Sequence, residues 1–139
     1  MKYLKNDLGM SLIEISIVLL IMGMVAAIIG PQLFGKVGQA KIKTTKAQIS
    51  DFETALDMYR LDMGRYPTTS EGLKALREQP SGSSNWKGPY FKKDIPKDPW
   101  DHDYQYTSPG SHGDYDILSY GADGVIGGDK ENKDITSWE

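Results

Sequence analysis

The residues best suited to chemistry lie near the C-terminal end, where residues 121–134 read GADGVIGGDKENKD. Glycines separate the acidic and amide side chains, so the segment offers oxygen ligands on a backbone able to fold around a cation. Calcium takes about six to eight oxygen ligands, backbone carbonyls often among them. The spacing is not that of an EF-hand, because the twelve-residue ligand pattern fails and flanking helices are missing. The sequence alone leaves two interpretations open, a calcium site and a solvated acidic turn.

A second candidate is Glu14, which is the one ionisable side chain in the apolar run of residues 10–29. A charged side chain at the centre of a bilayer costs roughly 2.5–3.5 kcal/mol on insertion scales, and less near the interface. One interpretation is that Glu14 stays hydrated at headgroup depth. The other is that it has a cationic partner. Cleavage after Gly9 would give Met10 a free amine, which Glu14 of a neighbouring copy can pair with.

No other grouping of residue types predicts an active site. The chain contains no nucleophile–base pair, phosphate-binding loop or convergent pair of acids, so the sequence predicts no enzyme. A net charge of −3 and a pI of about 5.4 argue against nucleic acid as the main partner, since phosphate binding requires clustered Lys and Arg. The chain has no cysteine, so an exported domain of this kind needs something other than a disulfide to hold its loops.

The element that must position Glu14 is a long apolar helix. Residues 10–29, at about 1.5 Å rise per residue, span roughly 30 Å, the thickness of one hydrocarbon core. Lys2 and Lys5 precede this run and the next basic residue is Lys36, which predicts a single-pass segment with a cytoplasmic N-terminus. A cleaved secretory signal is the alternative. The run is longer than a typical signal core, however, and continues directly into more helix.

The helical pattern resumes after Pro31, where we expect a kink. An apolar stripe at helical spacing predicts one face packed on a sheet, and Gly64 predicts the end of the helix. The stripe consists of Phe52, Ala55, Leu56, Tyr59 and Met63. A continuous helix from residue 10 to about 63 would be about 80 Å long, which suits a filament core of parallel helices.

The rest of the chain predicts short elements. Thr68 and Glu71 have capping-box spacing, which predicts a short helix through about Glu78. Residues 104–107 and 115–120 have the pattern of short strands separated by a turn. The predicted fold class is therefore α+β, a long helix packed on a small antiparallel sheet.

Residues 9–14, which read GMSLIE after a short basic segment, resemble the class III signal of type IV pilins and pseudopilins. The resemblance implies a leader at residues 1–9, a transmembrane and filament-core helix at 10–30, and a periplasmic domain at 31–139. It implies that a prepilin peptidase cleaves between Gly9 and Met10 and methylates the new amine. It also implies that Glu14 neutralises the amine of an adjacent subunit and so sets axial register. The chain departs from the family pattern at Met10, usually Phe, and at Leu8, usually basic.

A second set of blocks narrows the resemblance to the major pseudopilins of the type II secretion system. These blocks are residues 56–62 (LDMYRLD), 64–69 (GRYPTT), 71–73 (EGL), 98–100 (DPW), Tyr104, 108–110 (SPG), 112–113 (HG), 116–117 (DI), Gly121 with Asp123 and Gly124, 134–135 (DI) and Trp138. The family commonly has Gly where this chain has Asp101. The resemblance implies a homopolymer born in the bacterial inner membrane and assembled as a periplasmic filament that drives export of folded proteins across the outer membrane. Its implied partners are minor pseudopilins, the inner-membrane assembly platform and the peptidase.

The same resemblance implies one calcium ion in the C-terminal loop in place of a disulfide. Carried over by position, its ligands are the carbonyl of Tyr120 and the carboxylates of Asp123 and Asp134. Lys133 stands where the family has an acidic ligand, and Asp129 or Glu131 from a longer loop offers the missing oxygen. Two other functions stay open: a type IV pilin for adhesion or motility, many of which close this loop with two cysteines, and a membrane-tethered calcium-binding module that never polymerises.

Overall fold

The computed structural model describes residues 9–139, and it divides into two compact units, Met1–Val37 and Gly38–Glu139. We call them the N-terminal unit and the C-terminal unit. Residues 1–8 lie outside the described part, and with them most of the predicted leader, including Lys2, Lys5 and Leu8.

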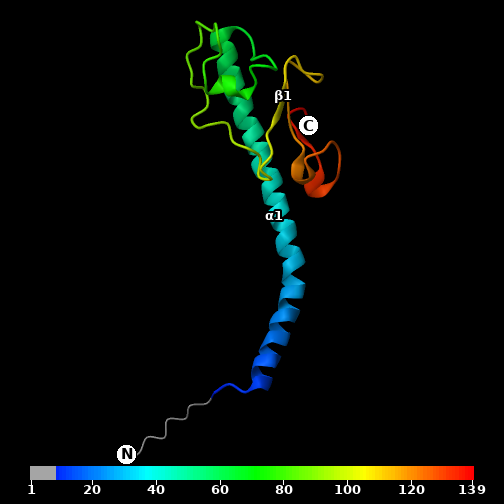
Figure 1. Cartoon of the computed structure of the whole chain (residues 1–139). Coiled ribbons are helices and arrows are strands. Elements are labelled where there is room, and N and C mark those ends of the chain that lie inside the picture. The colour runs from blue at the N-terminus through cyan, green and yellow to red at the C-terminus, as the bar shows by residue number, and fades with distance from the viewer. Residues whose placement is uncertain (1–8) are drawn as a thin grey trace, which may run out of the picture. The chain divides into compact units, whose positions relative to one another are not determined.

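One helix, α1, covers Leu12–Met63 and belongs to both units (Figure 1). It includes Pro31 without a break in the helical assignment, and it begins two residues later than predicted. At its C-terminal end the Gly64 N–H donates to the carbonyl of Arg60 at 2.7 Å. Gly64 has φ +74°, a conformation that glycine adopts without a Cβ clash, so the predicted end of the helix is confirmed.

In the N-terminal unit the apolar side chains have no cover. The most apolar 18-residue window of α1 has a mean hydropathy of 2.8 and none of its residues is buried. Ile13, Leu19 and Ile28 are each more than 60% exposed. An uncovered apolar helix of this length fits a membrane anchor.

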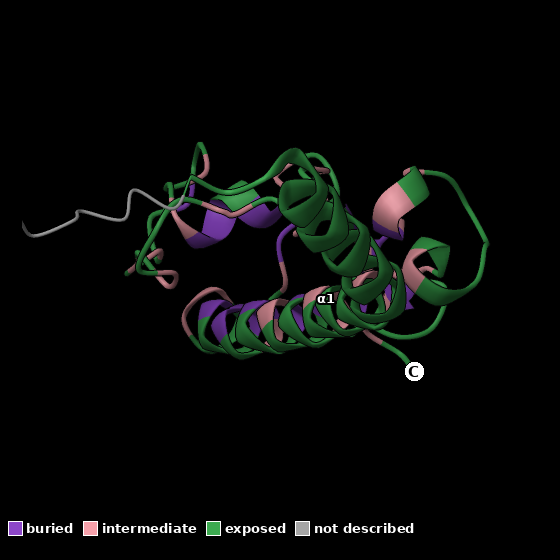
Figure 2. Cartoon of the chain, turned by 90° about the horizontal axis from the view of Figure 1, so that it is seen from below, coloured by how far each residue is buried: buried purple, intermediate pink, exposed green. Residues whose placement is uncertain are grey.

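In the C-terminal unit the predicted stripe of α1 forms the core. Phe52, Leu56 and Tyr59 are fully buried, and Met63 packs at the edge of the same cluster. Figure 2 shows these buried positions along α1 between exposed ones. Phe52 contacts Tyr104 edge to face, with ring centroids 5.1 Å apart, so aromatic rings fill the space between helix and sheet.

The sheet has three antiparallel strands in the order β1-β2-β3. β1 (Gln105–Thr107) pairs with β2 (Asp116–Ser119), and β2 pairs with β3 (Ile135–Thr136). The first two strands match the predicted pair to within one residue at each end. The third has only two residues, too few for an alternating pattern, so the sequence did not predict it.

The predicted helix after Thr68 is wrong in type and length. The capping-box hydrogen bonds are present, since Glu71 accepts from the Thr68 N–H at 2.9 Å and the Glu71 N–H donates to the Thr68 hydroxyl at 3.2 Å. Only a 3-10 turn, η1 (Leu73–Leu76), follows. Gly72, with φ +64°, leaves the helical region between the box and the apolar residues, so the box cannot lead into an α-helix.

Candidate functional site

Glu14 lies in the first turn of α1 and closes a capping box with Ser11. Its carboxylate accepts from the Ser11 N–H at 2.8 Å, while its own N–H donates to the Ser11 hydroxyl at 3.3 Å. Two of the unpaired donors at the helix start are thereby satisfied within one chain. Our sequence analysis missed this role, although the Ser-x-x-Glu spacing signals it. Pairing of Glu14 with the Met10 amine of a neighbour stays a prediction.

The predicted cleavage site directly precedes the helix. Gly9 and Met10 are exposed and outside regular structure, and Met10 is 72% exposed. A peptidase needs an accessible, non-helical peptide bond, and this arrangement offers one. Cleavage and methylation themselves stay predictions.

The acidic loop, residues 121–134, folds into two 3-10 turns that pack on each other, η2 (Gly121–Asp123) and η3 (Lys130–Asn132). Gly121 has φ +71°, and a Cβ there would lie 3.0 Å from the carbonyl oxygen of Lys133. Gly128 has φ +105° and faces the carbonyl of Asn132 in the same way. The glycines thus let the backbone at the two ends of the loop approach closely.

Asp134 is the acidic residue whose surroundings fit a cation. Its Oδ2 accepts from the Gly127 N–H at 3.1 Å, while its Oδ1 is buried and has no hydrogen-bond partner. A buried carboxylate oxygen without a partner is costly unless a cation or water satisfies it. The residue types of the loop, carboxylates and carbonyls, are those that calcium prefers.

The other predicted ligands are spread around the loop. Asp123 is exposed and accepts from the Val125 N–H at 3.2 Å. Asp129 is exposed, Tyr120 is half-buried directly before η2, and the Glu131 side chain lies against Gly38 of α1. Within residues 9–139 no three acidic, histidine or cysteine side chains are gathered tightly enough to hold a metal ion. The assignment of these residues to calcium stays a prediction.

Asp98 holds the base of the loop in place, and the sequence analysis did not single it out for this. It is 4% exposed and accepts from the Ser119 hydroxyl at 2.6 Å and from the backbone N–H groups of Trp100 and His102 at 3.1 and 2.9 Å. The Ser119 hydroxyl also accepts from the Gly121 N–H at 3.2 Å. One buried carboxylate therefore connects the turn after Asp98 to the first residue of the loop.

Histidine side chains contact the C-terminal segments at two places. The Nδ1 atom of His102 lies 3.0 Å from the carbonyl oxygen of Gly121, so this ring contacts the first residue of the acidic loop. His112 Nδ1 lies 3.1 Å from Asp116 Oδ2, and the ring stacks on Trp138. Trp138 is 37% exposed, whereas Trp100 packs at the edge of the core.

Comparisons with known proteins place this chain among relatives of known family. The family model described as type II secretion system (T2SS), protein G, matches residues 32–138. The type II secretion system core protein G of Pseudomonas aeruginosa is 42% identical over 138 residues, which are 97% of each chain. That of Vibrio cholerae is 40% identical over 99% of this chain and 96% of its own. Among solved structures, the major pseudopilin of the type 2 secretion system of enterohaemorrhagic Escherichia coli is 39% identical, with a TM-score of 0.65 over 78% of this chain and 95% of that one.

Proposed function

This chain belongs to the type II secretion system protein G family, and on that premise we propose that it is the major subunit of a periplasmic pseudopilus. One observation carries the proposal: a helix with uncovered apolar side chains leads directly into the domain that matches the family. Such a chain can sit in a bilayer as a monomer and bury the same helix against copies of itself in a filament. The role is structural, with no catalysis and no nucleic acid.

Insertion comes first. The apolar part of α1 crosses the bacterial inner membrane once, with Lys2 and Lys5 on the cytoplasmic side. A prepilin peptidase then removes residues 1–9 and methylates the amine of Met10. The exposed, non-helical peptide between Gly9 and Met10 supports this step.

Assembly follows from the apolar face. When a subunit leaves the bilayer, side chains such as Leu19 and Ile28 lose their lipid cover and face water unless neighbouring helices take its place. Glu14 leaves the bilayer with these side chains. An ion pair with the Met10 amine of a neighbour stabilises it, because an unpaired carboxylate among apolar helices is costly. This pair sets the axial register. Minor pseudopilins and the inner-membrane assembly platform complete the machinery, and filament growth moves folded proteins across the outer membrane.

In this proposal, a bound calcium ion stabilises the C-terminal loop. Asp134, Asp123 and the Tyr120 carbonyl would hold the ion, and Asp129 or Glu131 would supply a further oxygen. The buried, unpaired Oδ1 of Asp134 supports it, because a cation would satisfy that atom. When bound, the ion would bring the loop's carboxylates together and add to the hydrogen bonds at the base of the loop, in a chain that has no cysteine for a disulfide.

Intact mass after expression with a prepilin peptidase, the minor pseudopilins and the inner-membrane assembly platform tests the proposal. The expected result is loss of residues 1–9 and gain of one methyl group, together with filaments visible by electron microscopy. The matched control is Gly9→Leu, which should keep its full mass. A chain left uncut while the same peptidase processes a pilin control contradicts the proposal, and so does a processed chain that stays membrane-tethered without forming filaments.

A further inference from the structure

The charged residues of α1 just beyond the apolar run are all positive. Residues 15–50 contain Lys36, Lys41, Lys43 and Lys46 and no acidic residue. In the C-terminal unit, Lys43 and Lys46 are exposed and three residues apart, so they are neighbours on one face of the helix. Among residues 9–139, neither has a carboxylate within salt-bridge distance. Their charges are therefore free to meet an anionic partner.

The acidic loop contributes two further lysines beside Lys46. Lys46, Lys130 and Lys133 line one cavity of about 240 Å³ between α1 and the C-terminal segment, together with the carboxylates of Glu53, Asp134 and Glu139. Lys133 pairs with Glu139 at 3.6 Å, whereas Lys130 is exposed and makes no ion pair within the described residues. Lys130 therefore adds an exposed, unpaired positive charge on the loop side of this cavity.

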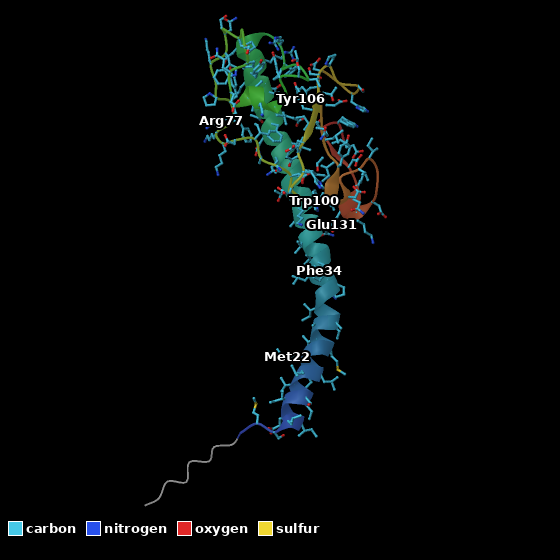
Figure 3. The ribbon with its side chains drawn as sticks, viewed as in Figure 1. Met22, Phe34, Arg77, Trp100, Tyr106 and Glu131 are labelled. Carbon is cyan, nitrogen blue, oxygen red and sulfur yellow. The ribbon has the colours of Figure 1, made fainter. Side chains whose placement is uncertain are left out.

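An apolar tip projects from this loop. Val125 is 59% exposed and Ile126 is 82% exposed, and glycines with positive φ stand on both sides of the pair. The loop lies at the end of the C-terminal unit where α1 enters it, because Glu131 contacts Gly38. Figure 3 shows Glu131 beside this end of the unit, with Arg77 and Tyr106 farther along α1. We call Lys43, Lys46, Val125, Ile126 and Lys130 the basal surface.

The length of the chain limits how far this surface can lie from the apolar run. Only residues 31–37 separate Gly38 from Gly30, where the apolar run ends, and even a fully extended chain of this length spans less than about 30 Å. Exposed aliphatic side chains together with unpaired lysines are the combination that binds bilayer surfaces, the first by burial at the headgroup boundary and the second by attraction to anionic lipids.

We propose that the basal surface docks on anionic phospholipid headgroups while the subunit is still anchored, and that it detaches when the subunit enters the filament. The inference rests on the proposed function in requiring the membrane anchor. A second copy of the chain fits the surface less well. In a filament of parallel helices the basic segments of neighbours lie at similar heights, and residues 15–50 offer no carboxylate to oppose them. The loop's own carboxylates weaken the attraction to lipid, so calcium should be present in the test.

The absence of cysteine makes the test direct, because one introduced cysteine is labelled uniquely. The full chain with Ile126→Cys, carrying an uncharged fluorophore, is reconstituted in vesicles that contain a headgroup-labelled quencher lipid. We expect quenching when the vesicles contain phosphatidylglycerol and little in pure phosphatidylcholine. The same fluorophore on Leu61→Cys, which replaces an 85% exposed side chain near the other end of the C-terminal unit, should stay unquenched in both.

Charge variants identify the lysines. Removing one lysine near an anionic surface lowers docking about fivefold, so Lys43→Gln with Lys46→Gln should lower the ratio of docked to undocked label about 25-fold. Lys92→Gln with Lys93→Gln removes two exposed lysines elsewhere and should change the ratio less than twofold. Glutamine keeps the helix propensity of lysine, so the fold is unaffected.

Three results would overturn the proposal: equal quenching in both kinds of vesicle, equal losses in the two double variants, or quenching that depends on the number of copies per vesicle at fixed lipid composition. The last would mean that a second copy covers the surface. Flotation with the vesicles separates this inference from the proposed function. A chain that floats without docking contradicts only the inference, whereas a chain that does not float contradicts the anchor as well.

Discussion

The imidazole ring of His112 lies flat on the indole ring of Trp138, with ring centroids 3.9 Å apart and planes 5° apart. His112 belongs to the turn between β1 and β2, and Trp138 is the second-last residue of the chain. Asp116 fixes the edge of the histidine ring, with its Oδ2 at 3.1 Å from the Nδ1 of His112. The C-terminal tail is thus fastened to the hairpin by a stacked pair instead of a covalent bond.

Asp116 makes this contact pH-dependent. Its burial acts to raise its pKa, but hydrogen bonds from the His112 ring and from the N–H groups of Ser111 and His112 outweigh burial, so the pKa of Asp116 lies below its usual value. A carboxyl whose pKa is lowered on folding stabilises the protein above its unfolded pKa of about 3.9, and this stabilisation is lost as the pH falls through the folded pKa.

We therefore expect Asp116→Asn to lower the free energy of unfolding by about 1–2 kcal/mol at pH 7, and the difference from wild type to shrink below about pH 4. Thermal unfolding of the full chain in detergent from pH 7 to 3 measures it. Asp103→Asn, at an exposed carboxylate, is the control. A difference that stays constant over this range would show that charge plays no part.

Asp98 should be the most sensitive acidic residue for stability. Asp98→Ala leaves the hydroxyl of Ser119 and two backbone N–H groups without their acceptor in a buried place, so we expect a loss of about 3 kcal/mol. Urea unfolding monitored by circular dichroism measures this loss. Asp103→Ala, nearby and exposed, should change stability by less than about 0.5 kcal/mol. Equal losses of stability from the two substitutions would contradict the stabilising role of Asp98 at the base of the loop.

The sequence predicted the parts of the fold that repeat over several turns or residues. The stripe from Phe52 to Met63 and the glycine stop at Gly64 specify α1, because burial of one face and the left-handed terminal residue act locally. β1 and β2 were predicted because their strand-like pattern and the turn between them are also local features of the sequence.

Contacts between residues far apart in the sequence could not be predicted from local patterns. Asp98 and Ser119 are 21 positions apart and meet only because the hairpin folds back, so no local spacing announces them. β3 forms because Ile135 is held beside Ser119, and two residues carry no pattern of their own. The Ser-x-x-Glu spacing at Ser11 and Glu14 is a local signal of a capping box. The prediction for Glu14 considered only its charge within the apolar run.

Calcium removal tests the loop. With free calcium about 100-fold above its Kd, binding should stabilise the folded chain by about 2.7 kcal/mol, or about 10 °C in Tm for a domain of this size. Thermal unfolding with calcium or with chelator measures the shift, and Asp134→Ala should abolish it. Asp51→Ala removes an exposed carboxylate on α1 and should keep the full shift. Equal midpoints with and without chelator in the wild type would contradict the stapling role.

Glu14 has two candidate roles, and substitutions separate them. Glutamine at the third helical position still closes a capping box, whereas alanine does not. If charge pairing with a neighbour's amine sets register, Glu14→Gln should fail to form filaments as completely as Glu14→Ala, because only the charge is lost. Ser11→Ala removes the serine side of the box and keeps the carboxylate, so it should assemble, at a cost of about 1 kcal/mol in helix stability. Electron microscopy and cross-linking of processed subunits measure assembly. Normal filaments from Glu14→Gln would mean that the carboxylate serves the helix start within one chain, since the cap survives in that variant and the charge does not.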